Sequence, residues 1–174
     1  MSKVVFVVGG NRSGKSFFAQ TYAESLSGKR VYVATAIAFD EEMKERIRKH
    51  KSIRADKWHE TIEEPYNISR ILSNMRGKTD VMLIDCITLW LNNLILKFEN
   101  DFQKIYREID KFVKEISNVT YNLFIVSNEV GMGIVPENKI ARLFRDLSGY
   151  ANQKIAKASD EFYISFCGYN LRLK

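Results

Sequence analysis

Near its start the sequence reads Val4-Val5-Phe6-Val7-Val8-Gly9-Gly10-Asn11-Arg12-Ser13-Gly14-Lys15-Ser16. The apolar run at the front, rich in valine, predicts a buried β-strand. The residues that follow it match the pattern G-x-x-x-x-G-K-[ST] and lead directly into a helical pattern, Lys15–Leu26. A phosphate loop requires this order of strand, loop and helix, so the sequence predicts an α/β fold that binds phosphate.

The chemistry of this loop suits a nucleoside triphosphate. Gly9 and Gly14 allow the backbone to curl so that successive N–H groups point inward at phosphate oxygens. The amino end of the helix adds partial positive charge. Lys15 is expected to reach the β and γ phosphates, and the Ser16 hydroxyl to coordinate Mg²⁺. We therefore expect the whole loop, Gly9, Gly10, Asn11, Arg12, Ser13, Gly14, Lys15 and Ser16, to bind the nucleotide.

Apolar runs typical of strands alternate with longer amphipathic runs over the rest of the chain. The predicted strands are Val4–Val8, Arg30–Ala34, Val81–Asp85, Leu123–Ser127 and Phe162–Phe166. The predicted helices are Lys15–Leu26, Glu41–Lys51, Tyr66–Met75, Asp101–Ser117 and Glu137–Ala158. Continuous apolar strands separated by helices indicate a largely parallel sheet with helices on both faces, the phosphate-loop NTPase fold, in a single domain over residues 1–174.

A carboxylate is predicted opposite the loop. Asp85 ends the apolar run Val81–Asp85, and ligands of open α/β sheets bind at the carboxyl ends of the strands. We expect Asp85 to hold Mg²⁺ together with Ser16, partly through water. The alternative is an aspartate that only caps the next helix.

Composition limits the class of protein. The net charge is +6, but the excess is concentrated between Lys44 and Lys57, which argues for one anionic site rather than a nucleic-acid surface. No apolar run of 18 or more residues predicts a membrane span, and no signal peptide precedes the glycines, so we expect a cytoplasmic protein. Cys86 and Cys167 both lie in apolar runs and are expected to be buried, reduced thiols.

His50 is a candidate nucleophile within the basic segment. Arg46, His50 and Arg54 are spaced four residues apart, so on a helix they would form one stripe. An imidazole between two guanidiniums is discouraged from protonating, and a neutral imidazole is nucleophilic. The alternative is a structural histidine, because Ile47 and Met43 lie on the same partly apolar face.

Several segments, taken in order, resemble the bifunctional adenosylcobinamide kinase / adenosylcobinamide-phosphate guanylyltransferase family, over essentially the whole chain. These segments are Gly9–Ser16, Val33–Ala36, Asp40–Met43, Arg46–Lys51, Trp58, Glu63–Pro65, Ile84–Asn93, Ser127–Pro136 and Ala141–Asp146. The run Asn-Glu-Val-Gly-Met-Gly-Ile-Val-Pro at 128–136 is the most specific of them.

The resemblance implies two reactions. A nucleoside triphosphate, GTP or ATP, phosphorylates the aminopropanol hydroxyl of adenosylcobinamide, and GMP from GTP is then joined to that phosphate, giving adenosylcobinamide-GDP in cobalamin biosynthesis. It also implies a GMP–histidine intermediate on His50. GTP contacts carry over to the phosphate loop, Ala34, Thr35, Ala36, Lys51, Ser52, Ile53, Arg54, Glu63 and Asp85.

Two segments leave alternatives open. One residue more than the family's spacing separates Trp58 from Glu63, and this segment holds His59, the rival nucleophile, which lies outside the matched motif. The glycines of Asn128–Pro136 suggest a loop that approaches a ligand closely, for which we expect the corrinoid. Asn128 and Glu129 could equally serve the nucleotide or a subunit contact.

Two other functions compete with the bifunctional enzyme. One is a simple small-molecule kinase in which His50 is structural. The other is a nucleic-acid-binding NTPase, for which the sequence shows no basic stripe interleaved with aromatic residues. We therefore expect GTP, ATP and the corrinoid as partners and no nucleic acid. A homo-oligomer is also expected, because a small chain with a large substrate can build its site between subunits.

Overall fold

A single seven-stranded sheet forms the centre of the protein, in a computed structural model that describes residues 2–38, 41, 44, 45, 48 and 57–174. The strands are β1 (Val4–Gly9), β2 (Arg30–Ala34), β3 (Glu60–Glu63), β4 (Val81–Asp85), β5 (Asn122–Asn128), β6 (Glu161–Phe166) and β7 (Tyr169–Arg172). Their order across the sheet is β3-β2-β4-β5-β1-β6-β7. Only the β6–β7 pair is antiparallel, so the expected parallel sheet is confirmed.

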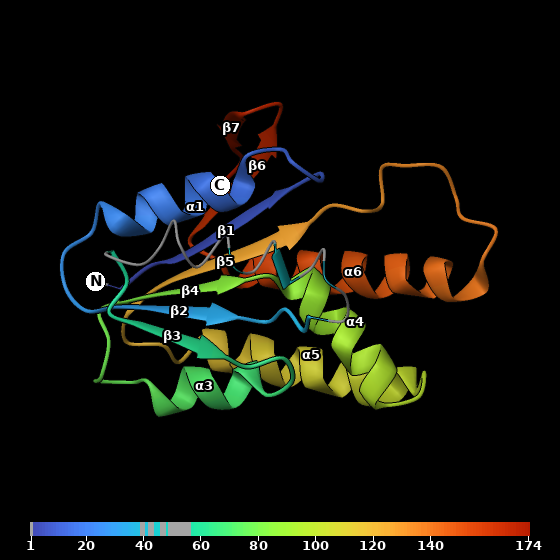
Figure 1. Cartoon of the computed structure of the whole chain (residues 1–174), viewed down its shortest axis with the longest axis horizontal. Coiled ribbons are helices and arrows are strands. Elements are labelled where there is room, and N and C mark those ends of the chain that lie inside the picture. The colour runs from blue at the N-terminus through green and yellow to red at the C-terminus, as the bar shows by residue number, and fades with distance from the viewer. Residues whose placement is uncertain (1, 39–40, 42–43, 46–47, 49–56) are drawn as a thin grey trace.

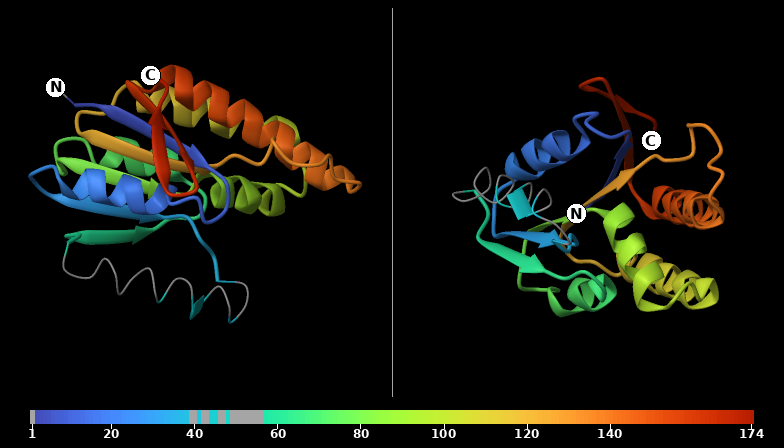
Figure 2. Two further views of the ribbon diagram at one scale, coloured as in Figure 1. Left: turned by 90° about the horizontal axis from the view of Figure 1, so that it is seen from above. Right: turned by 45° about the vertical axis from the view of Figure 1, so that its right-hand side comes forward.

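Helices cover both faces of this sheet, as expected (Figures 1 and 2). The helices are α1 (Lys15–Glu24), α3 (Ile68–Asn74), α4 (Ile87–Lys97), α5 (Phe102–Ile116) and α6 (Lys139–Ala158). On one face α1 packs on an apolar cluster that includes Val5, Val7, Leu83 and Phe124. On the other face α3, α4, α5 and α6 bury the larger cluster, with Trp90 and Phe112 fully buried at its centre. No helix of the described residues is long and apolar enough to cross a membrane.

Alternation along the strands determines which side chains reach each face. In β5, Leu123 and Ile125 belong to the larger cluster, whereas Phe124 and Val126 belong to the cluster under α1. Successive side chains of a strand point to opposite faces, so residues of the same parity share a face. The carboxyl ends of the parallel strands lie together at the right-hand edge in Figure 1, where the phosphate loop and the segment between β5 and α6 emerge.

The β6–β7 hairpin was not predicted, and it changes the surroundings of one cysteine. Its turn consists of Cys167 and Gly168, which have φ angles of 50° and 86°. Cys167 is therefore exposed at a turn, and the expectation that it is buried was wrong. Cys86 is buried as expected, and burial raises the pKa of its thiol to about 12.

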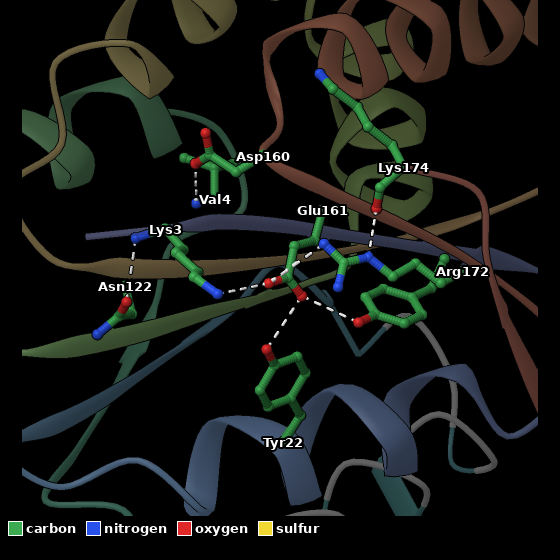
Figure 3. A network of polar contacts seen from close by, with 9 residues as sticks. Lys3, Val4, Tyr22, Asn122, Asp160, Glu161, Arg172 and Lys174 are labelled. Atoms are coloured by element: carbon green, nitrogen blue, oxygen red, sulfur yellow. Dashed lines mark hydrogen bonds and ion pairs between the residues drawn. The ribbon is translucent and has the colours of Figure 1, made fainter. Parts of the chain in front are cut away.

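A buried carboxylate holds the hairpin to the rest of the molecule (Figure 3). The Glu161 side chain, at the start of β6, accepts hydrogen bonds from Lys3 Nζ at 2.8 Å, Tyr22 OH at 3.0 Å and Tyr163 OH at 3.0 Å. Arg172 of β7 lies 3.7 Å from the same carboxylate. One side chain thus links the start of the chain, helix α1 and both strands of the hairpin.

Candidate active site

The phosphate loop has the tightly curled backbone that its glycines predict. It connects the end of β1 to the start of α1, and Gly14 adopts a φ of 93° in the left-handed region that favours glycine. The Ser13 N–H donates to the Gly10 carbonyl at 3.3 Å. The Ser13 carbonyl in turn accepts from the N–H of Gly168, in the β6–β7 turn, at 3.0 Å. The hairpin therefore supports the loop from outside.

Lys15 lies inside the curled loop. Its side chain is buried, and Nζ donates to the Gly10 carbonyl at 3.1 Å. Burial lowers the pKa of this ammonium, while the negative charge of Asp85 opposes the shift. Among the described residues no carboxylate lies within ion-pair distance of Lys15. A buried cation held only by a neutral carbonyl can exchange that partner for a phosphate oxygen.

Asp85 ends β4 as predicted, on the face of the sheet that α1 covers. Its Oδ2 accepts a hydrogen bond from Tyr32 OH at 2.8 Å, which orients the carboxylate. Ser16 follows in the first turn of α1. A hydroxyl and a carboxylate are hard oxygen ligands of the kind that Mg²⁺ prefers, so these residues fit the expected ion. No group of three or more His, Cys, Asp or Glu side chains in the described part of the chain could hold a metal alone, so phosphate and water oxygens would complete its shell.

Three of the predicted residues lie in one row across the sheet. Ala34 pairs with Glu63 on β3 and with Asp85 on β4. All three lie at the carboxyl ends of their strands, and the phosphate loop also follows the carboxyl end of its strand. The structure therefore places Glu63 and Asp85 at the same end of the strands as the loop, with β2, β4 and β5 between Glu63 and the strand that leads into the loop.

Thr35 is fully buried and its polar groups are engaged by protein. The hydroxyl donates to the Cys86 carbonyl at 2.8 Å and accepts from the Cys86 N–H at 2.8 Å. The Thr35 carbonyl accepts from Asn93 Nδ2 at 2.8 Å. These contacts favour a structural role in which Thr35 joins the ends of β2 and β4, leaving its half-buried neighbours Ala34 and Ala36 nearer the surface.

His59, the rival nucleophile, lies at the amino ends of the strands, away from the phosphate loop. Its Nδ1 accepts a hydrogen bond from the N–H of Arg30 at 3.1 Å, and its own N–H donates to the Arg30 carbonyl at 3.0 Å. Arg30 begins β2, whereas Ala34 ends it beside Asp85. A five-residue strand separates its two ends by about 13 Å, so His59 is remote from the phosphate loop.

The remaining predicted residues lie outside the described part of the chain. They are the candidate nucleophile His50 and the expected nucleotide contacts Lys51, Ser52, Ile53 and Arg54, which fall within residues 49–56. Most of the predicted helix Glu41–Lys51 is outside it as well.

The segment after β5 combines a fixed backbone with exposed apolar side chains. From α6, Arg145 donates to the carbonyls of Ile134 at 3.0 Å and Gly131 at 2.7 Å. Met132, Ile134 and Val135 are nevertheless 78%, 96% and 65% exposed. An exposed apolar surface whose backbone is held by Arg145 is typical of a site that contacts a large ligand or a partner.

Sequence reasoning missed several residues that shape the site. Tyr32 orients Asp85, and Asn93 ties together the segments that follow β2 and β3 by donating to the carbonyls of Thr35 and Pro65. Tyr32 lies within an apolar strand, and the only sequence signal for its role is its position two residues before the end of that strand. Asn93 lies within a matched segment, but its role depends on contacts between strands that are distant in sequence.

Comparison with known proteins identifies the family. The family model described as cobinamide kinase / cobinamide phosphate guanyltransferase matches residues 5–173. The chain belongs to this family. Proteins named bifunctional adenosylcobalamin biosynthesis protein are 32% identical in Escherichia coli, over 98% of this chain and 99% of the relative, and 35% identical in Salmonella typhimurium, with the same coverage. A third, from Pseudomonas aeruginosa, is 34% identical over 97% of this chain and 95% of its own.

A solved structure supports the fold. An ATPase from the type III secretion system of pathogenic bacteria superposes with a TM-score of 0.55, covering 93% of this chain and 50% of the ATPase chain. The sequence identity is 9%, so this likeness concerns the fold alone.

Proposed function

We propose that this protein phosphorylates adenosylcobinamide with a nucleoside triphosphate and then transfers GMP from GTP to the product, giving adenosylcobinamide-GDP in cobalamin biosynthesis. The match of residues 5–173 to the cobinamide kinase / guanyltransferase family carries this proposal. The phosphate loop, placed at the same sheet edge as Asp85, supports it. We include a cytoplasmic location and a homo-oligomer in the proposal.

In the kinase reaction the substrate hydroxyl oxygen attacks the γ-phosphorus of the triphosphate, and the hydroxyl proton is released to water. The bond from this phosphorus to the β–γ bridging oxygen breaks, and the nucleoside diphosphate leaves with the electron pair. Lys15 leaves the Gly10 carbonyl and stabilises the negative charge on the β and γ phosphates. Ser16 and Asp85 would hold Mg²⁺, which when bound neutralises further phosphate charge.

In the GMP transfer a neutral imidazole nitrogen of His50 attacks the α-phosphorus of GTP. The α–β phosphoanhydride bond breaks and pyrophosphate leaves, held by the phosphate loop and Lys15. A phosphate oxygen of adenosylcobinamide phosphate then attacks the same phosphorus, and the P–N bond breaks to restore the imidazole. Dividing one displacement into two steps is the advantage of a covalent intermediate.

The corrinoid is proposed to contact the apolar segment after β5. Met132, Ile134 and Val135 are strongly exposed there, while Arg145 holds their backbone. A corrin ring carries methyl groups among its amide side chains, and burying these methyl groups against the exposed apolar side chains would be favourable at roughly 25 cal/mol per Å².

Labelling with [α-³²P]GTP tests the function. We expect acid-labile label on the protein, retained in the His59→Ala variant and lost in His50→Ala, which keeps its kinase activity. His59 is a suitable control because its ring is bound to Arg30 at the far edge of the sheet. Absence of label on the unmodified protein, with kinase activity present, would indicate a simple small-molecule kinase. Label lost in His59→Ala instead would contradict the assignment of His50.

A further inference from the structure

Asn128, the last residue of β5, has a side-chain oxygen for which the described residues provide no hydrogen-bond donor. Its Oδ1 is buried and accepts no hydrogen bond from any described residue. A buried carboxamide oxygen without a donor is costly and requires an explanation. We propose that this carboxamide binds the terminal phosphate of the nucleotide, an inference that rests on the proposed function.

The strand order places Asn128 between the two halves of the phosphate site. β5 lies between β1, which leads into the loop, and β4, which ends in Asp85. Asn128 pairs directly with Gly9, at the start of the loop. A ligand that extends from the loop toward a metal ion at Asp85 must pass over the end of β5. The part of the triphosphate that does so is the terminal phosphate.

The side chain of Asn128 also points to the face of the sheet that carries the other residues of the site. Phe124 and Val126 point to the face covered by α1, so alternation puts Asn128 there as well. Asp85 follows the same parity as Leu83 on β4, and Lys15 begins α1 itself. The carboxamide therefore shares its face with the lysine and the carboxylate of the site.

Two hydrogen bonds hold the backbone of Asn128, whereas its Oδ1 atom has no donor among the described residues. The Asn128 N–H donates to Thr88 Oγ1 at 2.7 Å, and its carbonyl accepts from Asn152 Nδ2 at 3.1 Å. Thr88 and Asn152 come from α4 and α6, so two of the helices on the opposite face hold this residue. Groups held in advance by such contacts contribute most to catalysis, because no ordering is required during the reaction.

A carboxamide suits this position chemically. Its NH₂ can donate to a phosphoryl oxygen, and its oxygen can accept from a metal-bound water or from the attacking hydroxyl. Being neutral, it adds no repulsion toward the triphosphate, which a carboxylate at the same place would do. Asn128 would thus orient the phosphoryl group between Lys15 and Asp85 while transferring no proton itself.

The test compares Asn128→Ala with Asn122→Ala, an asparagine at the opposite end of the same strand. Calorimetry with GTP and with GDP, each with Mg²⁺, is expected to show about tenfold weaker GTP binding in Asn128→Ala and unchanged GDP binding. In the kinase assay kcat should fall by about 100-fold with little change in the KM for the corrinoid. The melting temperature should not fall, because the carboxamide oxygen that is removed has no hydrogen-bond donor among the described residues.

Asn128→Asp should weaken GTP binding further, since a carboxylate repels the phosphate. A drop in melting temperature with GTP and GDP affinities that fall together would assign Asn128 a structural role and overturn the proposal, as would an unchanged kcat. The GTP-against-GDP comparison needs no corrinoid. An unmodified protein that binds GTP but phosphorylates no corrinoid would contradict the proposed function, while this comparison still decides the role of Asn128.

Discussion

Gly9 occupies a position that has no room for a side chain. A Cβ atom there would lie 2.5 Å from Ser13 Oγ and 2.5 Å from the backbone carbonyl oxygen of Ser165 on β6. The Ser165 contact is with the backbone of a neighbouring strand and cannot be relieved by a rotamer change. In Gly9→Ala the loop must shift, and we expect a loss of about 1–3 kcal/mol in unfolding free energy and at least tenfold weaker GTP binding, measured by urea denaturation and calorimetry.

Gly10→Ala is the matched control for this change. A Cβ at Gly10 meets no atom within 4 Å, and its backbone needs no positive φ. The variant should keep the stability of the unmodified protein. Equal losses of stability in Gly9→Ala and Gly10→Ala would show that crowding against Ser165 is not the cause.

The sequence predicted the residues of the site that act through local geometry. The phosphate loop follows a strand and Asp85 ends one, and each of these contexts is contained in a short segment. The roles of Tyr32 and Asn128 depend instead on which strands are neighbours in the sheet. Nothing in the sequence states that β5 lies between β4 and β1, so the position of Asn128 beside Gly9 could not be predicted from its own segment.

At the scale of elements, four of the five predicted strands, β1, β2, β4 and β5, are buried along most of their length, while β6 is mostly half-buried. Arg30–Ala34 and Val81–Asp85 have the predicted bounds, β1 and β6 are longer than predicted by one residue at one end, and β5 is longer by one residue at each end. The missed strands lack this signal, since three of the four residues of β3 and all four of β7 are exposed. Helix α4 was missed for the opposite reason. Seven of its eleven residues are buried, so it has little polar face to mark it as amphipathic.

The turn of the β6–β7 hairpin is expected to stabilise the conformation of the phosphate loop, because Gly168 donates a hydrogen bond to Ser13. Gly168 has a φ of 86°, its N–H donates to Ser13, and a Cβ there would meet no atom within 4 Å. Gly168→Ala should therefore cost about 1 kcal/mol through backbone conformation alone. Because the strained turn carries the hydrogen bond to Ser13, GTP binding should also weaken, by about threefold to tenfold.

Gly77→Ala separates these two effects. Gly77 also has a positive φ, 70°, and free space around its Cβ position, but it lies in the turn between α3 and β4. Both variants should lose similar thermal stability, and only Gly168→Ala should bind GTP more weakly. If Gly77→Ala weakens GTP binding equally, the effect is global, and the hairpin has no specific role.

At the scale of the whole molecule, the two faces of the sheet have different tasks. The face with the larger apolar cluster carries four helices and most of the buried apolar residues. It also supplies Thr88 and Asn152, which form hydrogen bonds with the backbone of Asn128. The face under α1 carries the polar groups of the site at its carboxyl edge. The hairpin lies beyond β1 at the edge of the sheet, and Glu161 connects it to α1 and to Lys3.

This connection predicts how stability depends on pH. Burial is the largest single influence on the pKa of Glu161 and raises it, but hydrogen bonds from Lys3, Tyr163 and Tyr22 together outweigh it, and the net shift is downward. A carboxyl whose pKa is lower in the folded state contributes stability above its unfolded pKa, near 4.5. That contribution disappears as the pH falls through the folded value. Stability should therefore decline in acid, below about pH 4.5.

Glu161→Gln removes this titration and isolates its effect. At pH 7 the variant should be less stable by about 1–3 kcal/mol, because Gln loses the charge-assisted hydrogen bonds from Lys3 and the two tyrosines. The difference in unfolding free energy between the two proteins should shrink as the pH falls below 4.5, since the unmodified glutamate becomes neutral too. Urea denaturation at pH 7, 5, 4 and 3.5 measures it, with the exposed Glu137→Gln as control. A difference that stays constant down to pH 3.5 would mean that the folded-state pKa of Glu161 is not coupled to stability, and that the hairpin is held by packing alone.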